Sequence, residues 1–372
     1  MLKSARFFVV IALHASFACG TPKREPEPPA PGATRAAFSR GFNFGNRLDA
    51  PTEGDWGPEL RASDFATVAA RGFDHVRLPV RFSGHAPMTA PFSIDPALLR
   101  RVDWALNQAS QNGLSVVLAF QYYDQLMQQP EAHWGRFLAL WDQLALRYQT
   151  ASSEVAFELL SEPNGALEAQ YNELVAQAVA QIRSSNPERR IIVNSTGFAR
   201  TPTLAELVLP EDPNIVASVH VYAPEPFTFQ GAPWAGDQYG TTGVVFPGPP
   251  DTPLEPVSAA LANDTVKLWF ERYNTLPAAE NPAGPSPIDA TLTAITSFVR
   301  EQGHEVYVGE IGASLNGDEQ SRFNFLSLLR QRFEAENLGW AVWDNNGGDM
   351  AVLGSAAGTW RDSTIDALIP AE

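Results

Sequence analysis

The sequence predicts an α/β protein, a single (β/α)8 TIM barrel with a long insertion between strands six and seven. Eight short apolar runs of strand length alternate with segments in which apolar residues repeat at helical spacing. Parallel strands need crossover helices, and right-handed crossovers close this alternation into one barrel. The chain has 372 residues, 44% of them hydrophobic, a length that fits one such barrel or two ordinary domains. The alternation runs through the chain with hardly a break, which favours the barrel.

The beginning of the chain has the pattern of an export signal. Lys3 and Arg6 precede an apolar run over 7–18. That run is too short to span a bilayer, but it suits the core of a signal peptide. We therefore expect residues 1–19 to be a signal peptide, and the protein to be exported.

The only cysteine of the chain is Cys19, which follows Ser-Phe-Ala at 16–18. This resembles a bacterial lipobox, so Cys19 is the predicted lipidation site and the signal is expected to be of lipoprotein type. Cleavage near Ala18 or Gly20 followed by plain secretion is the alternative. A single cysteine excludes an internal disulfide and a cysteine-based metal site.

The segment that follows is unlike the rest of the chain. Residues 20–36 include the stretch TPKREPEPPAPGAT, which is rich in proline and charge and has no aromatic residue. This composition is typical of an extended tether that belongs to no fold. The barrel domain is expected to occupy 37–372.

The first half of the barrel is expected to contain four strands, each an apolar run: 42–44, 73–80, 114–120 and 155–160. Helices are expected after the first three, at 61–70, between Asp95 and Gly113, and at 133–148. The second of these has clear capping signals, with Asp95 as N-cap, Pro96 in the first turn and Gly113 just past the end. Its apolar residues form one face at helical spacing.

The second half is expected to contain strands at 190–194, 215–222, 305–310 and 340–343. A helix with Leu167, Tyr171, Leu174, Ala178 and Ile182 on one side follows strand four. Further helices are expected at 288–303 and through 325–333. The interval 223–286 is far longer than an ordinary loop. It is therefore predicted to be an excursion over the top face of the barrel.

Composition narrows the range of partners and cofactors. The formal net charge of −16 argues against nucleic acid or an anionic membrane as a partner, because both would repel the protein. The sequence has no phosphate-binding glycine loop, no HExxH motif and no histidine cluster at metal-ligand spacing. It therefore predicts no metal and no organic cofactor.

Polar residues gather at the C-terminal ends of the predicted strands, where barrels of this kind carry their chemistry. These residues are Asn46, Arg77, Gln121, Tyr122, Glu162, Asn194, His220, Tyr222, Glu310 and Trp343. Any one of them alone is most simply a satisfied polar group at a strand end, but the whole set indicates an active site. Glu162 and Glu310 terminate two apolar runs, and such a carboxylate pair is what a glycoside-cleaving hydrolase requires.

The motifs at these positions resemble those of glycoside hydrolase family five, the cellulase family A of retaining β-glycanases. The resemblance extends from about residue 38 to 370, in family order. It rests on GFNFGNRLD at 41–49, EGDWG at 53–57, GFDHVRLPV at 72–80, FELLSEP at 157–163, VHVY at 219–222, FTFQG at 227–231, GEIG at 309–312 and WAVW at 340–343.

The resemblance implies roles for individual residues. Glu162 corresponds to the general acid/base, and Glu310 to the nucleophile. Arg77 and Tyr222 are expected to contact the nucleophile, and His220 to lie beside the acid/base. Trp343 is expected to be the flat apolar platform under the sugar ring, since sugar C–H faces stack on indole. Trp56 and Trp234 are predicted platforms on the cleft walls.

Two residues depart from the family pattern. Ser161 stands before the acid/base, where the family has an asparagine that binds the sugar 2-hydroxyl, and it is expected to reach the sugar only through water. Gln121, followed by Tyr122, stands at the end of strand three, where the family has histidines. Glutamine can replace a histidine hydrogen bond but cannot titrate. The expected cost is on the order of 10²-fold in rate.

Taken together, these features predict a retaining glycoside hydrolase that acts on β-linked polysaccharide, with an endo-β-1,4-glucanase as the leading activity. A mannanase or another β-glycanase is the alternative within the enzyme class. A weakly active or non-catalytic carbohydrate-binding protein on the same barrel is the alternative outside it. The protein is expected to be a monomer that reaches a membrane only through its N-terminal lipid.

Overall fold

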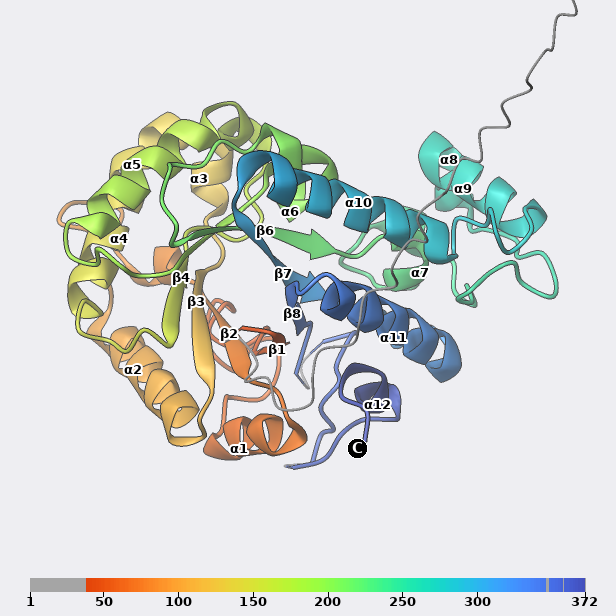
Figure 1. Ribbon diagram of the computed structural model, residues 1–372, viewed down its shortest axis with the longest axis horizontal. Coiled ribbons are helices and arrows are strands. Elements are labelled where there is room, and N and C mark those ends of the chain that lie inside the picture. Colours follow the sequence, from red (N-terminus) through yellow and green to blue (C-terminus); the bar gives the residue numbers. More distant parts are fainter. Residues whose placement is uncertain (1–37, 346–347, 357, 372) are drawn as a thin grey trace, which may run out of the picture. The chain divides into compact units, whose positions relative to one another are not determined.

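A computed structural model describes residues 38–345, 348–356 and 358–371 of the chain (Figure 1). The predicted signal peptide, Cys19 and the predicted tether lie outside these residues. Within the described ranges no helix combines the length and the apolar character needed to cross a membrane.

Eight parallel strands form a closed barrel, in which each strand pairs with the next and β8 pairs with β1. The strands are β1 (Arg40–Asn43), β2 (His75–Val80), β3 (Ser115–Phe120), β4 (Val155–Glu158), β5 (Ile191–Asn194), β6 (Ile215–Val221), β7 (Glu305–Ile311) and β8 (Gly339–Val342). Every bound lies within two residues of the predicted one. The predicted (β/α)8 barrel is confirmed.

Helices surround the barrel (Figure 1). They are α1 (Ala62–Arg71), α2 (Pro96–Gln111), α3 (Asp124–Gln128), α4 (Pro130–Arg147), α5 (Tyr171–Arg183), α6 (Thr196–Ala199), α7 (Glu225–Thr228), α8 (Ser258–Ala262), α9 (Asp264–Thr275), α10 (Pro285–Gln302), α11 (Glu319–Ala335) and α12 (Thr364–Leu368). Short 3-10 helices are η1 (Phe82–His85), η2 (Gly165–Gln170), η3 (Thr201–Glu206) and η4 (Asp237–Tyr239). The predicted cap of α2 is present, because Asp95 Oδ1 accepts a hydrogen bond from the backbone N–H of Ala97 at 2.7 Å.

The structure adds some elements that the sequence pattern did not indicate. The short helix α3 precedes α4, and η2 forms the first part of the predicted helix behind β4. Between β5 and β6 the connection contains only α6 and η3 in place of one long helix. These pieces are too short to show a helical period in the sequence.

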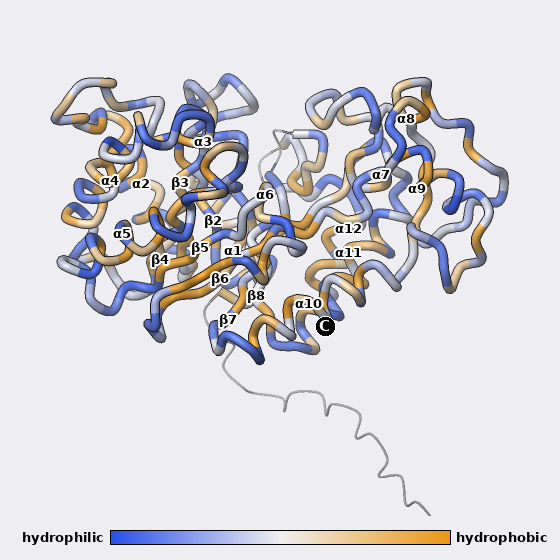
Figure 2. Tube along the Cα trace, turned by 90° about the horizontal axis from the view of Figure 1, so that it is seen from above, coloured by the Kyte–Doolittle hydropathy of each residue, from blue (hydrophilic) through white to orange (hydrophobic). Residues whose placement is uncertain are grey.

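The insertion between β6 and α10 is tied to the barrel through a buried glutamine. The Nε2 of Gln230 donates to the carbonyls of Phe227 (2.9 Å) and Val244 (3.1 Å), and its Oε1 accepts from the N–H of Val244 (3.0 Å). Ser314, just after β7, donates its hydroxyl to the Gln230 carbonyl at 2.8 Å. Figures 1 and 2 show α8 and α9 beyond α7, away from the barrel strands. The part of the insertion near the active-site end is therefore fixed by hydrogen bonds, whereas α8 and α9 are peripheral.

The strands are almost entirely buried, as expected of a parallel barrel covered by helices, and Figure 2 shows long hydrophobic stretches along β4 and β6. One apolar cluster is separate from the main core. It contains one residue from each of six strands and Phe38, which precedes β1: Phe38, Val117, Ala156, Ile192, Val216, Tyr307 and Ala341. Successive side chains alternate between the two faces of a strand, so this cluster belongs to the barrel interior. Two residues further along, the same inward face carries Glu158, Asn194 and Ser218, all fully buried. The interior therefore changes from apolar to polar toward the C-terminal ends of the strands.

Candidate active site

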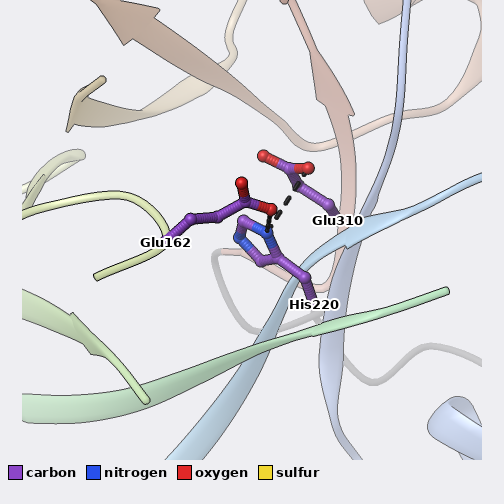
Figure 3. Close-up of side chains that lie close together, drawn as sticks. All are labelled: Glu162, His220 and Glu310. Atoms are coloured by element: carbon purple, nitrogen blue, oxygen red, sulfur yellow. Dashed lines mark hydrogen bonds and ion pairs between the residues drawn. The ribbon is translucent and has the colours of Figure 1, made fainter. Parts of the chain in front are cut away.

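Glu162 and Glu310 lie at neighbouring positions over the C-terminal end of the barrel (Figure 3). Glu310 is part of β7, while Glu162 follows β4 in a turn with φ of 54°, just before Pro163. His220 Nδ1 lies 2.9 Å from Glu162 Oε1 and 3.4 Å from Glu310 Oε2. One oxygen from each carboxylate and the histidine nitrogen all lie within 4.8 Å of one another. Carboxylates with oxygens this near are compatible with the arrangement of retaining glycosidases, whose two carboxyl groups lie about 5–5.5 Å apart.

The carboxylate of Glu310 is held by one donor on each oxygen. Arg77 Nη1 donates to Oε1 at 2.7 Å, and the hydroxyl of Tyr222 donates to Oε2 at 2.8 Å. Burial raises the pKa of Glu310, while the positive charges of His220 and Arg77 and the Tyr222 hydrogen bond act to lower it. The predicted contacts of Arg77 and Tyr222 with Glu310 are present.

Arg77 is the centre of a larger buried network. It donates through Nε and Nη2 to both oxygens of Glu158, at 2.7 Å each, and through Nη1 to Asn43 Oδ1 at 3.0 Å. Its Nη2 also donates to Gln121 Oε1 (3.2 Å) and Ser161 Oγ (2.9 Å). Burial acts against the charge of Arg77, but Glu158 and Glu310 raise its pKa above the ordinary value. The guanidinium is therefore charged and fixed in orientation.

Two members of this network were missed by the sequence analysis, Asn43 on β1 and Glu158 on β4. Both stand inside apolar runs, and a polar side chain inside a buried run must have a partner. That signal was available in the sequence for Glu158, because a carboxylate inside a buried run indicates a cation buried beside it. Asn46, the predicted strand-end residue, lies three positions past β1. Its side chain donates to Asp344, not to Arg77.

His220 lies between the carboxylates of Glu162 and Glu310. Burial lowers its pKa, but the negative charges of Glu310 and Glu162 outweigh this effect and raise it above the ordinary value. Nδ1 is the atom that faces both carboxylates. The predicted placement of His220 beside the acid/base is present, and the histidine also reaches the nucleophile.

Ser161 and Gln121, the two departures from the family pattern, both accept a hydrogen bond from Nη2 of Arg77. Ser161 is fully buried and Gln121 is almost so. A hydroxyl that accepts this bond can still donate its own hydrogen, so the expectation that Ser161 reaches the sugar through water stays a prediction. Tyr122 next to Gln121 is half-buried. Burial, with the negative charge of Glu162, raises the pKa of Tyr122 well above its ordinary value, so the phenol stays neutral.

The three predicted tryptophan platforms have different settings. Trp343 follows β8 and is half-buried, and its ring covers Gly45, where a Cβ would approach three ring atoms to 2.3–2.6 Å. Trp56 is 38% exposed, and the guanidinium carbon of Arg81 lies 5.1 Å from its ring centroid. The same carbon lies 5.4 Å from the Tyr122 ring. Trp56 is thus linked through Arg81 to Tyr122, which follows Gln121 of the Arg77 network.

Trp234 belongs to the insertion and is 59% exposed. Its Nε1 donates to Asp349 Oδ2 at 3.0 Å, and its ring packs edge-on against Phe229, with centroids 5.1 Å apart. Phe229 in turn lies 5.2 Å from the ring of Tyr222. A second line of aromatic contacts therefore leads from the catalytic carboxylates to an exposed indole.

A buried acidic network supports the segment around Trp343. Asp344 is fully buried and accepts a hydrogen bond from Asn46, while Asp49 accepts the N–H groups of Asn46 (3.1 Å) and Arg47 (2.7 Å). Burial raises the pKa of Asp344 well above its ordinary value, against the Asn46 hydrogen bond and the charge of Arg47. Burial also raises the pKa of Asp49.

The grouping of Glu162, His220 and Glu310 is also one that a metal ion could use, by the spacing of its donor atoms. Positive charge is already provided to Glu310 by Arg77, and His220 occupies the space between the carboxylates. Both features suit acid/base and nucleophilic chemistry on the carboxylates themselves.

Comparison with known proteins gives a consistent family relationship. The sequence profile of a family described as "Cellulase (glycosyl hydrolase family 5)" matches residues 38–349. Endoglucanase H of Acetivibrio thermocellus is 26% identical over 93% of this chain, which spans about a third (34%) of that longer protein. Endoglucanase C of the same species is 25% identical over 83% of this chain and 91% of its own length. Thermotoga maritima Cel5A, solved in complex with a mannotriose substrate, superposes with a TM-score of 0.78 at 30% identity, covering 89% of this chain and 97% of that one.

Proposed function

The chain belongs to glycosyl hydrolase family 5, and on that basis we propose that it cleaves β-linked polysaccharide with retention, by double displacement. Glu310 acts as the nucleophile and Glu162 as the general acid/base. The observation that carries the proposal is the pair of carboxylates that meet at His220 Nδ1, with contact atoms within 4.8 Å of one another.

In the first step the Glu310 carboxylate attacks the anomeric carbon and forms a glycosyl ester. The bond between that carbon and the glycosidic oxygen breaks, and Glu162 transfers its proton to the departing oxygen. Arg77 and Tyr222 keep the attacking carboxylate ionised and oriented before attack. His220 holds the carboxyl of Glu162 in place through Nδ1.

In the second step Glu162 takes a proton from water, and the water oxygen attacks the anomeric carbon. The ester bond to Glu310 breaks, and the sugar leaves with the β configuration that it had in the substrate. Trp343 provides an apolar surface for the sugar ring beside the reacting carbon. Two inversions at one carbon give net retention.

The leading substrate is a β-1,4-glucan cut within the chain. The indoles of Trp56 and Trp234 are both exposed. Trp56 is connected to Tyr122 through Arg81, and Trp234 is connected to Tyr222 through Phe229. Two exposed indoles reached by different contacts suit a substrate with several sugar units. Two relatives bear the name endoglucanase, whereas one structural neighbour was solved with mannotriose. β-Mannan is therefore the alternative substrate.

The second candidate function is carbohydrate binding without turnover. It is favoured by Ser161 and Gln121, which stand where the family has an asparagine and a histidine and which accept hydrogen bonds from Arg77. The complete set of Glu162, Glu310, His220 and Tyr222 favours catalysis.

One experiment separates these two functions. The purified protein is incubated with an activated 2-deoxy-2-fluoro glycoside, and the peptides are analysed by mass spectrometry. A stable adduct on Glu310, absent in Glu310→Gln, together with reducing ends released from soluble β-glucan or β-mannan, supports the hydrolase. Oligosaccharide binding with neither an adduct nor released ends supports the binding protein.

We further propose that the protein is exported and anchored by a lipid on Cys19. The support is the sequence alone: a basic start, a short apolar run and a lipobox-like triplet before the cysteine. Labelled palmitate should enter the wild-type protein but not Cys19→Ser. Labelling of neither protein, with release into the medium, would instead indicate plain secretion. Light scattering on the soluble domain tests the expected monomer.

A further inference from the structure

Glu158 is a buried charge that the proposed mechanism does not use. It ends β4, four positions before Glu162, and points to the polar part of the barrel interior, where it is fully buried. A carboxylate in such a position is costly unless it is paired and hydrogen-bonded.

The contacts of Glu158 are complete and directional. Oε1 accepts from Arg77 Nη2 (2.7 Å) and from Asn194 Nδ2 (2.9 Å), and Oε2 accepts from Arg77 Nε (2.7 Å). Two parallel bonds from one guanidinium fix the plane of that group as well as its position. Burial opposes the ionised form, but Arg77 lowers the pKa of Glu158 below its ordinary value. Glu158 therefore carries its negative charge throughout the neutral range.

The third nitrogen of the same guanidinium, Nη1, donates to the nucleophile Glu310 at 2.7 Å. One cation thus serves two carboxylates, through two nitrogens for Glu158 and one for Glu310. Two consequences follow for the nucleophile. The bidentate pair aims Nη1 at Glu310, and the charge of Glu158 offsets much of the positive charge that Glu310 would otherwise experience.

We propose that Glu158 is a positioning residue that aims Arg77 at Glu310 and offsets its charge, so that the nucleophile is ionised without being over-stabilised. This inference rests on the proposed role of Glu310 as nucleophile. A nucleophilic carboxylate is a weaker base, and attacks more slowly, when the cation that holds it has no second carboxylate to offset its charge.

The other groups that face Glu158 come from several elements. They are Asn194 on β5, His220 on β6, Tyr307 on β7 and Tyr171 on α5. Burial raises the pKa of both tyrosines, so each stays neutral. Around Arg77, therefore, the groups with raised pKa values that a pH profile can follow are Glu310, His220 and Asp49.

The test is the pH profile of kcat/KM for Glu158→Gln, a change that keeps the shape of the side chain and removes its charge. The acidic limb reports ionisation of the nucleophile. It should move to lower pH by about half a unit or more, because Arg77 then stabilises only Glu310. The plateau of kcat/KM should fall roughly tenfold or more. An acidic limb that stays in place or moves to higher pH would overturn the proposal.

Three variants separate charge from structure. Glu158→Asp keeps the charge, so the acidic limb of its pH profile should stay where it is in the wild type. Its side chain is shorter and aims Arg77 less well, so the plateau of kcat/KM should fall. An acidic limb shifted as far as in the glutamine variant would refute the proposal. If Glu158→Gln does not fold, Glu158→Asp decides alone, because either a moved acidic limb or an unchanged plateau in this variant would refute the proposal. Asn194→Ala removes a neutral donor to the same carboxylate, and its acidic limb should not move. Asp212→Asn breaks the Arg183–Asp212 ion pair, whose bond is 2.6 Å, and is the matched control for loss of an ion pair away from the site.

Failure of the proposed function has a different signature. A wild-type protein that neither releases reducing ends nor labels at Glu310 would remove the nucleophile on which this inference rests. An active, labelled wild-type protein with an unmoved acidic limb in Glu158→Gln would refute the role of Glu158 alone.

Discussion

The hydroxyl of Tyr222 donates to Glu310 Oε2 over 2.8 Å, on the carboxylate oxygen opposite to the one that Arg77 holds. Glu310 therefore has the neutral phenol of Tyr222, with His220 Nδ1 3.4 Å away, on one oxygen and the guanidinium of Arg77 on the other. Burial and the nearby carboxylates keep the pKa of Tyr222 well above its ordinary value, so the phenol remains a donor. The two contacts should be separable by mutation.

Tyr222→Phe should lower kcat/KM by about 10–10²-fold, because one donor to the anion is lost in a buried site. A hydrogen bond to the charged form lowers a pKa, so its removal should move the acidic limb to higher pH. This is opposite to the shift expected for Glu158→Gln. The measurement is kcat/KM as a function of pH for both variants, and shifts in the same direction would contradict the assignment.

Glu162→Ala should lose activity in proportion to how much the leaving group needs a proton. Hydrolysis of polysaccharide should fall about 10²–10⁴-fold, the usual contribution of a general acid. An aryl glycoside with a dinitrophenolate leaving group should still form the glycosyl-enzyme. Azide should then accelerate turnover and give a β-glycosyl azide, which the wild-type enzyme does not form in quantity. Equal losses on both substrates, with no effect of azide, would remove Glu162 from the acid/base role.

Trp234→Ala should weaken binding of long substrates more than short ones. The indole is exposed and lies on a line of aromatic contacts from Tyr222, so it is expected to hold a sugar distant from the cleaved bond. KM for long oligosaccharides should rise roughly five- to tenfold, the equivalent of about 1 kcal/mol, at nearly constant kcat. Leu268→Ala, at a 53% exposed position on α9 of the same insertion, is the control. An equal effect on disaccharide derivatives would contradict this placement.

Gly45→Ala should damage the cleavage subsite. A Cβ at Gly45 would lie 2.3–2.6 Å from ring atoms of Trp343, so the indole must move. We expect kcat/KM to fall more than tenfold, since the platform under the reacting sugar is displaced. Gly135→Ala is the matched control, because its Cβ would meet nothing within 4 Å on the exposed side of α4. Unchanged activity in Gly45→Ala would show that Trp343 is not the platform.

Asp344→Asn should stabilise the fold at neutral pH. The folded-state pKa of Asp344 is raised, so the folded state binds its proton more tightly than the unfolded chain does. Stability from such a group is greatest below the unfolded pKa of about 3.9 and falls as pH rises toward the folded value. The gain in Tm of Asp344→Asn over wild type should therefore be larger at pH 7 than at pH 4. Asp142→Asn, at an exposed position on α4, is the control, and a gain independent of pH would contradict the assignment.

The barrel could be predicted because each strand is a buried apolar run with turn residues at its end. The chemistry at the strand ends could be predicted for the same reason, since Glu162, His220 and Glu310 break those runs. The family profile, which matches residues 38–349, confirms the resemblance seen in the motifs. The roles of the individual residues stay predictions until the variants are measured.

The network below the catalytic carboxylates could not be predicted as readily. Glu158 and Asn43 reach Arg77 from different strands, and their meeting depends on barrel closure and register, which a linear pattern does not contain. Ser161 could be identified as unusual, but its hydrogen bond to Arg77 depends on the shape of the turn before Glu162. The inside of the insertion was also beyond reach, because it is held by scattered buried side chains such as Gln230 and Asn281, whose hydrogen bonds to the backbone follow no periodic pattern.

The pairing of β1 with β8 has a consequence for when this protein becomes a catalyst. Arg40 lies opposite Trp340 in that ladder, so the two ends of the domain must meet before the sheet is continuous. Contacts between such distant segments form slowly, because loop-closure entropy opposes them. The site itself spans the same distance, from Asn43 beside Arg77 to Trp343 over Gly45. A nascent chain that has not yet released its last strand therefore lacks part of the candidate site, so the proposed hydrolysis can begin only after the whole domain has been synthesised.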